Sequence, residues 1–211
     1  MKPEIDYTLY LVTDRELMAA DSIEESVEQA IRGGCTVVQL REKTVSSREF
    51  YQTAVRVREI TARLGVPLII NDRADLALAV DADGVHIGQK DLPYNAVRRI
   101  VGKDKIVGVS TSTVTEALAA AAAGADYLGV GAMFATGTKT DAPLTGMDEL
   151  RRICSETKIP VVVIGGINKD TVPLFKGTGI KGIAVVSAIV SQKDSAGAAR
   201  ELKSLFQNAD I

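Results

Sequence analysis

The sequence predicts an α/β fold in which eight strand-and-helix units close into a (β/α)8 barrel, a TIM barrel, with residues 1–211 forming a single domain. Short runs rich in β-branched residues recur along the chain and alternate with longer segments of helical period. Each predicted strand is followed by its own helix. The chain has 211 residues, of which 46% are hydrophobic, so it can bury one sizeable core but is short for two α/β domains.

The predicted elements can be assigned in order along the chain. The expected strands are Leu9–Thr13, Val37–Leu40, Leu68–Ile70, Gly84–Ile87, Ile106–Val109, Tyr127–Val130, Val161–Ile164 and Gly182–Val186. The expected helices are Ile23–Arg32, Ser47–Leu64, Arg73–Val80, Tyr94–Val101, Val114–Ala123, Met147–Cys154, Lys169–Lys176 and Ala196–Gln207. An open doubly wound sheet has similar local patterns, and the count of eight favours the barrel.

Local signals at the helix ends agree with these boundaries. Ser46 and Thr113 are expected N-caps, and Glu116 would complete a capping box with Thr113. Several glycines stand where helices should end, which is a common way to terminate a helix: Gly33, Gly65, Gly102, Gly124 and Gly177.

The overall charge and hydropathy exclude several kinds of partner. Lys and Arg total 25 against 27 Asp and Glu, a net charge of -2, so the chain has no general basic field for nucleic acid or an anionic membrane. Apolar stretches such as Val161–Ile164 fall far short of the ~20 residues that span a bilayer. Because Met1–Asp6 does not resemble a secretory signal, we expect a cytoplasmic protein.

Residues that commonly build nucleophilic or zinc sites are scarce. Cys35 and Cys154 stand far apart and outside any metal-binding motif, so we expect buried thiols. His86 is the only histidine and lies inside a predicted strand, which favours a packed, hydrogen-bonded side chain over a general base.

Polar residues instead gather at one edge of the predicted barrel. The active site of such a barrel lies at the carboxyl ends of its strands. The residues that follow strands two to five are Arg41, Glu42, Lys43, Asn71, Asp72, Arg73, Gln89, Lys90, Asp91, Ser110, Thr111 and Ser112. The sequence therefore predicts a polar site at this edge.

This edge contains the groups needed to bind a diphosphate with a metal ion. Asp72 and Asp91 end neighbouring strands, where two carboxylates can share Mg2+ while substrate phosphate oxygens fill other positions. The alternative for each aspartate is a helix cap or a solvated loop charge. Arg41, Lys43 and Lys139 would converge on the same polyanion, Arg41 as a bidentate fork and the lysines as compact charges.

A second anion site is expected after the last two strands. Gly165 and Gly166 follow strand seven, and Ser187 follows strand eight, where many barrels bind phosphate with backbone N–H groups. A tight turn before a helix capped by Asn168 is the other interpretation of the glycine pair. The long irregular stretch 131–146 is also expected to be functional. Its 137–140 segment lacks the Gly-Lys-Ser/Thr ending of a P-loop, so an NTPase is rejected.

The sequence resembles the thiamine-phosphate synthase family from about residue 9 to residue 190. The matching segments are Leu9–Asp14, Val38–Lys43, Ile70–Arg73, Gly84–Asp91, Gly108–Ser110, Thr136–Lys139, Val163–Ile167 and Val185–Ile189. The resemblance implies Mg2+-dependent joining of a hydroxymethylpyrimidine diphosphate to a thiazole phosphate, with thiamine phosphate and diphosphate as products.

The resemblance also implies a role for each matching residue. A pyrimidine diphosphate would contact Gln39, Leu40, Arg41, Glu42, Lys43, Asn71, Ser110 and Lys139, with Asp72 and Asp91 as the metal ligands. A thiazole phosphate would contact Thr136, Gly137, Thr138, Gly166, Val186 and Ser187. The residues expected to act in catalysis are Arg41, Lys43, Lys139 and Ser110. Ala135 departs from the proline expected before the loop threonines, which puts the stiffness of that loop in doubt.

Other readings stay open at this point. One alternative is an enzyme of the same fold but another class, such as a thiazole tautomerase or a sugar-phosphate isomerase, that keeps only the phosphate site after strands seven and eight. Another is a regulatory barrel that binds thiazole phosphate or thiamine phosphate without turning it over. The sequence leaves the oligomeric state open, a homo-oligomer included, and does not decide whether the thiazole is carboxylated.

Overall fold

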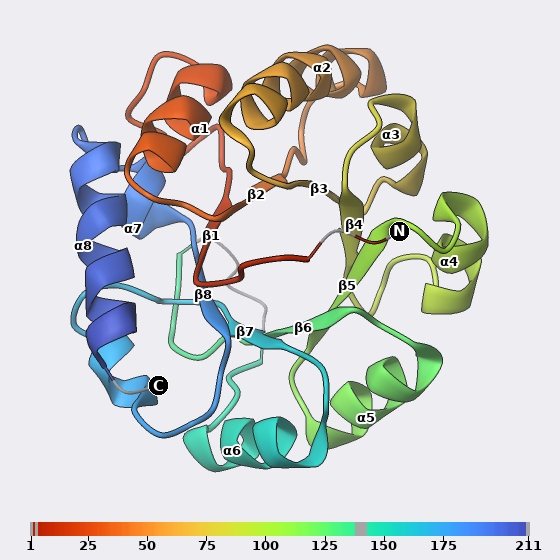
Figure 1. The fold of residues 1–211 in the computed structure, drawn as a ribbon, viewed down its shortest axis with the longest axis vertical. Helices are drawn as coiled ribbons and strands as arrows, with labels where there is room; N and C mark the ends of the chain where they lie inside the picture. The colour runs from red at the N-terminus through yellow and green to blue at the C-terminus, as the bar shows by residue number, and fades with distance from the viewer. Residues whose placement is uncertain (1, 3, 138–142, 210–211) are drawn as a thin grey trace.

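In a computed structural model that describes residues 2, 4–137 and 143–209, the strands form a closed parallel barrel in the order β1 to β8 (Figure 1). The strands are β1 (Leu9–Val12), β2 (Val37–Leu40), β3 (Leu68–Asn71), β4 (Gly84–Ile87), β5 (Ile106–Thr111), β6 (Tyr127–Val130), β7 (Val161–Val163) and β8 (Gly182–Val185). β1 pairs with β8 as well as with β2, so the sheet is closed. This confirms the barrel and excludes the open sheet.

Helices surround the barrel (Figure 1). They are α1 (Ile23–Arg32), α2 (Ser47–Leu64), α3 (Ala74–Ala79), α4 (Tyr94–Val101), α5 (Val114–Ala123), α6 (Met147–Glu156), the 3-10 helix η1 (Val172–Phe175), α7 (Ser187–Val190) and α8 (Ser195–Asn208). The predicted caps are present: Ser46 accepts from the Glu49 N–H, and Thr113 and Glu116 form the capping box. No helix in the described ranges is long and apolar enough to cross a membrane.

Two stretches after β7 and β8 differ from the prediction. The helix expected over Lys169–Lys176 is a single 3-10 turn, because Pro173 lacks the N–H that an α-helix needs and Gly177 leaves the helical region at φ 68°. The chain after β8 forms the short helix α7, which the sequence analysis missed because four residues are too few to show a period.

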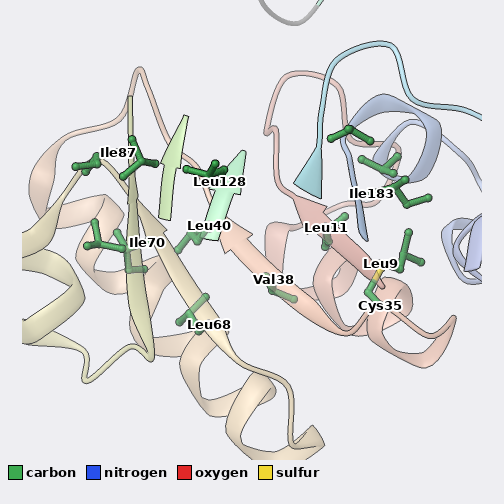
Figure 2. Close-up of a cluster of buried hydrophobic side chains, with 14 of the residues drawn as sticks. Leu9, Leu11, Cys35, Val38, Leu40, Leu68, Ile70, Ile87, Leu128 and Ile183 are labelled. Atoms are coloured by element: carbon green, nitrogen blue, oxygen red, sulfur yellow. The ribbon is translucent and has the colours of Figure 1, made fainter. Parts of the chain in front are cut away.

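The core has two layers that follow the alternation of side chains along each strand. Leu9 and Leu11 of β1 point outward and pack between the strands and the helices, where Val38, Ile70 and further aliphatic residues join them (Figure 2). Tyr10 of β1 points into the barrel instead.

The inner layer is aromatic at one end of the barrel. The Tyr7 and Tyr127 rings lie 4.8 Å apart, and the Tyr10 and Tyr127 rings lie 5.9 Å apart. Gly108 of β5 makes room for Tyr127, because a Cβ at Gly108 would collide with that ring. These rings fill the barrel from its amino-terminal end, so open volume is left at the end where the strands finish.

Candidate active site

A cavity of about 170 Å³ opens at the carboxyl ends of the strands. Eight of the predicted site residues line it: Gln39, Arg41, Asn71, Ser110, Thr136, Gly166, Val186 and Ser187. They come from β2, β3 and β5 and from the chain after β6, β7 and β8, so the fold brings together segments far apart in the sequence. Both predicted anion sites therefore face one volume.

The arginine of the predicted diphosphate site is fixed in place by its neighbours. Its Nη1 donates to Asp14 Oδ2 at 3.1 Å, and its backbone N–H donates to Thr13 Oγ1 at 2.9 Å. Asp14 also accepts from the backbone N–H of Glu16 at 3.1 Å, which anchors its carboxylate. Arg41, which follows β2, is thus held in position by two residues that follow the neighbouring strand β1.

Leu40 and Glu42, on either side of Arg41, do not present their side chains to the cavity. Leu40 is fully buried in the outer core, so only its backbone is available to a ligand. Arg15 holds the Glu42 carboxylate with two donors, at 2.6 Å from Nη2 and 3.2 Å from Nε. Glu42 is therefore engaged in an ion pair that shapes the loop after β2.

Lys43 and the two predicted metal ligands lie together beside the cavity: they are not among its lining residues, but Asp72 directly follows Asn71, which is one of them. Lys43 Nζ donates to Asp72 Oδ2 at 2.5 Å. Asp91 Oδ2 accepts from the Gly88 N–H at 2.7 Å, which fixes this carboxylate over the end of β4. Burial, and then the neighbouring Asp72 carboxylate, raise the pKa of Asp91. The Asp72 carboxylate therefore lies close enough to oppose the ionisation of Asp91.

This pair fits a magnesium ion that is completed by a substrate. No cluster of three or more His, Cys, Asp or Glu side chains suited to a metal occurs in the described ranges, so an all-protein metal cage is not formed there. Mg2+ typically takes one or two carboxylates together with substrate phosphates and waters. Asp72 and Asp91 supply that donor set, and a cation between them would offset the repulsion that raises the pKa of Asp91.

The backbone turns sharply at Asp72 to deliver this carboxylate. Asp72 has φ 60°, in the left-handed region where Asp is tolerated better than most residues. Its N–H donates to the His86 carbonyl at 2.8 Å, so β4 holds the turn. The strained conformation lies at the predicted metal site, where such backbone is often found.

The glycine pair after β7 permits a close approach by the loop after β6. Gly165 and Gly166 have φ of 95° and 67°. A Cβ at Gly166 would lie 2.6 Å from Phe134 Cβ, and a Cβ at Gly165 would lie 2.6 Å from Ala132 Cβ. The Phe134 N–H donates to the Gly165 carbonyl at 3.1 Å. Glycine is required here to pack the two loops, and both loops line the cavity.

The remaining predicted residues lie at or beyond the edge of the described chain. Gly137 is exposed, with open space where a side chain would project. Thr138 and Lys139 lie outside the described residues.

A buried row of polar side chains forms the floor of the cavity, and only part of this row was predicted from the sequence. His86 is 7% exposed and shares hydrogen bonds with Tyr127 Oη at 2.8 Å and Ser110 Oγ at 2.9 Å, so the prediction of a packed, hydrogen-bonded histidine is confirmed. Tyr10 connects Tyr127 to Gln39. Both tyrosines lie at inward-facing positions of the expected strands, which could have indicated that they belong to this row. The hydrogen bond between them depends on how the barrel closes, and the strand pattern does not show that.

These features define a class of protein. The barrel is closed, and its strand ends carry basic and acidic residues on one side and a glycine turn before a short helix on the other. This is the architecture of TIM-barrel enzymes that act on phosphorylated small molecules.

Comparison with known proteins identifies the family within this class. Residues 9–189 match the family described as thiamine monophosphate synthase. The chain is 63% identical over 206 residues to the thiamine-phosphate synthase of Clostridium beijerinckii, covering 98% of this chain and 99% of that protein. It is 60% identical over 208 residues to that of Ruminiclostridium cellulolyticum, covering 99% of each. A solved thiamine phosphate pyrophosphorylase from Pyrococcus furiosus superposes with a TM-score of 0.90 at 41% identity, covering 97% of each chain.

The chain belongs to the thiamine monophosphate synthase family, and it is a transferase of thiamine biosynthesis. The family resemblance noted in the sequence is thereby confirmed.

Proposed function

We propose that the protein joins 4-amino-2-methyl-5-(diphosphooxymethyl)pyrimidine to 4-methyl-5-(2-phosphoethyl)thiazole, or to its carboxylated form with loss of CO2, to give thiamine phosphate and diphosphate. The observation that carries the proposal is the single cavity lined by Arg41 and Asn71 on one side and by Gly166 and Ser187 on the other. Two anionic substrates would sit at the two sides with their rings between them.

The proposed reaction is a displacement at the methylene carbon of the pyrimidine. The bond from this carbon to the diphosphate oxygen breaks first, and the electron pair leaves with diphosphate, so a cation stabilised by the pyrimidine remains. The thiazole nitrogen then donates its lone pair to form the new C–N bond. Because no proton has to be removed from either partner, no general base is needed, which agrees with the scarcity of nucleophile and base residues at the site.

The work left to the protein is to stabilise negative charge on the departing diphosphate. Arg41 lines the cavity and its guanidinium is held by Asp14, and Lys43 is paired with Asp72, the residue after the cavity-lining Asn71. We assign Lys139 the same role. Mg2+, held by Asp72 and Asp91, would supply Lewis-acid neutralisation of the diphosphate oxygens.

The backbone after β7 and β8 would hold the thiazole phosphate. Gly166 and Ser187 line the cavity, and Thr136 from the loop after β6 lines it between them. Backbone N–H groups at such a turn bind phosphate without a positively charged side chain. Thr138 completes this proposed set.

We further propose that the protein works in the cytoplasm. Burial raises the pKa of the Cys35 thiol to about 12 and that of the Cys154 thiol to about 11, and both cysteines are free, as is usual in a reducing compartment. The partners we propose are the two small molecules above; nucleic acid and membrane are not among them.

The test is to incubate the purified protein with both substrates and Mg2+ and to measure thiamine phosphate and diphosphate. Equal molar amounts of both products, abolished by EDTA and restored by excess Mg2+, would support the proposal. Omitting the thiazole phosphate controls for simple hydrolysis of the pyrimidine diphosphate. Binding of thiazole phosphate without either product would overturn the proposal in favour of a tautomerase-like or purely binding barrel.

A further inference from the structure

The glycine turn after β7 is held by two polar side chains that follow it in the sequence. Thr171 Oγ1 lies 3.1 Å from the Gly166 carbonyl oxygen, and Asn168 Nδ2 donates to the same oxygen at 3.4 Å. Gly166 and Ile167 line the cavity, whereas Asn168 and Thr171 are not among its lining residues. The carbonyl of a cavity-lining residue is thus held from outside the cavity, and we call this pair of side chains, Asn168 and Thr171, the clasp.

The clasp is itself ordered by hydrogen bonds. Asn168 Oδ1 accepts from the N–H groups of Asp170 at 2.9 Å and Thr171 at 3.2 Å, which leaves Nδ2 to face Gly166. Thr171 Oγ1 accepts from the Asn168 N–H at 2.9 Å. Its one proton therefore goes to a carbonyl, that of Gly166 at 3.1 Å or that of Asn168 at 3.2 Å. Toward Gly166, both side chains are donors.

Local turn formation explains only part of this arrangement. An Asn side chain that accepts from N–H groups two and three residues ahead is a common way to order a turn, here the one that leads into η1. The bonds to the Gly166 carbonyl run the other way along the chain, two and five residues back. These bonds act on the turn that lines the cavity.

The turn needs such support because its glycines restrict the backbone little. Gly166 has φ 67° and no Cβ, so sterics alone do not fix the peptide plane that follows it. The peptide between Gly166 and Ile167 is trans, and in a trans peptide the carbonyl and the following N–H point in opposite directions. By fixing the Gly166 carbonyl, the clasp also directs the Ile167 N–H away from Asn168 and Thr171.

The N–H groups of this turn are available to a ligand. Within residues 2, 4–137 and 143–209, neither the Gly166 N–H nor the Ile167 N–H has an acceptor. Ile167 is only 5% exposed, and buried backbone N–H groups are almost always paired. An anionic oxygen in the cavity would pair with them, as phosphate does at other turns of successive backbone N–H groups.

From this geometry we infer that Thr171 and Asn168 are positioning residues for the phosphate of the thiazole substrate. They hold the Gly166 carbonyl away from the cavity, so that the Ile167 N–H donates to a phosphate oxygen inside it. A peptide that turned over would present its carbonyl oxygen to the anion instead and repel it. The inference rests on the proposed function, because it concerns the second substrate of that reaction, and it adds two residues that act through the backbone.

The experiment compares Thr171→Val, which removes the hydroxyl at nearly constant size, with Thr171→Ser, which keeps it. The matched control is Thr178→Val. Thr178 Oγ1 donates to the Phe175 carbonyl at 2.6 Å, the same three-residue spacing as from Thr171 to Asn168, but Thr178 does not line the cavity. For each variant we would measure kcat, the KM of each substrate, and the inhibition constant of the thiazole alcohol, the same ring without its phosphate.

Thr171→Val is expected to raise the KM of thiazole phosphate by about 5-fold, the size expected for one lost hydrogen bond. The KM of the pyrimidine diphosphate and the inhibition constant of the thiazole alcohol should stay within twofold, because neither molecule would place a phosphate at this turn. Thr171→Ser and Thr178→Val should behave as the parent.

Three results would overturn the inference and leave the clasp with a local structural role. They are a thiazole-phosphate KM of Thr171→Val within twofold of the parent, an equal rise in the other KM or in the inhibition constant of the alcohol, and a Thr171→Ser variant as impaired as Thr171→Val. If Thr171→Val fails to fold in a thermal melt, Asn168→Ser decides the same question. Serine keeps an oxygen for the N–H groups ahead of it but loses the amide donor to Gly166, so the same split in KM values is expected at about 3-fold.

The two levels of the proposal fail in different ways. A parent protein that forms no thiamine phosphate refutes the proposed function itself. An active parent whose clasp variants bind thiazole phosphate as well as the parent does refutes only the inference.

Discussion

Lys43 Nζ lies 2.5 Å from Asp72 Oδ2, so the lysine expected at the diphosphate is paired with a carboxylate expected at the metal. The two roles compete for one ion pair. A cation held by Asp72 and Asp91 would compete with Lys43 for the Asp72 carboxylate, and the freed Lys43 ammonium could then pair with a diphosphate oxygen. We therefore expect metal and diphosphate binding to be coupled at this ion pair.

Asp72→Asn is expected to raise the Mg2+ concentration needed for half-maximal activity by at least about 10-fold, since even indirect support of a metal ligand is worth that much. Initial rates over a Mg2+ titration would check it. Asp148→Asn is the matched control, because the Asp148 side chain is 98% exposed on α6. An Asp72→Asn titration that overlays the parent curve would remove Asp72 from the metal site.

Lys139→Ala is expected to lower kcat by around 10²-fold or more, the usual loss when one preorganised charge-stabilising group is removed. Steady-state turnover at saturating substrates is the measurement. Lys158→Ala provides the control, since Lys158 is exposed and precedes β7 at the opposite end of the barrel. Turnover within twofold of the parent would exclude Lys139 from the mechanism.

Gly166→Ala is expected to raise the KM of thiazole phosphate by about 10-fold or more, because a Cβ there would collide with Phe134 and displace the proposed phosphate turn. Gly65→Ala has the same backbone cost, with φ 68°, but meets open space at the end of α2. Gly65→Ala should lose about 1 kcal/mol of unfolding free energy from the backbone conformation alone, Gly166→Ala should lose more because of the collision, and only Gly166→Ala should change the KM. Equal KM values for the two would contradict a phosphate site at Gly166.

Cys35 is expected to resist thiol reagents in the folded protein, because burial raises its pKa from 9.0 to about 12 and the thiolate is the reactive form. The sign for stability follows from the same shift. Between pH 9 and 12 the folded state keeps this proton while the unfolded state loses it, so the contribution of Cys35 to stability falls as pH rises. Denaturant melts at pH 8 and 10 should differ less for Cys35→Ala than for the parent. Rapid labelling of Cys35 at pH 8 would contradict this account.

The fold was predictable because its signals are local. Strand and helix periods depend on near neighbours, and the capping box joins Thr113 to Glu116 across three residues. The 3-10 turn at Val172–Phe175 departs from the expected helix because one proline outweighs the periodicity around it.

A site residue could be predicted from the sequence only where its position at the end of a strand was sufficient to place it in the site. Arg41 and Ser110 follow that rule and line the cavity. The bond between Tyr10 and Tyr127 joins residues 117 positions apart, and it depends on the register with which β1 to β6 close around the barrel. Strand patterns alone do not contain that register.

The aromatic rings at the amino-terminal end of the barrel also determine the side from which a ligand reaches the cavity. Since the rings of Tyr7, Tyr10 and Tyr127 fill the amino-terminal end of the barrel, a ligand enters from the opening at the strand ends. Both proposed substrates would therefore have to arrive through this one opening, and both products would have to leave by it.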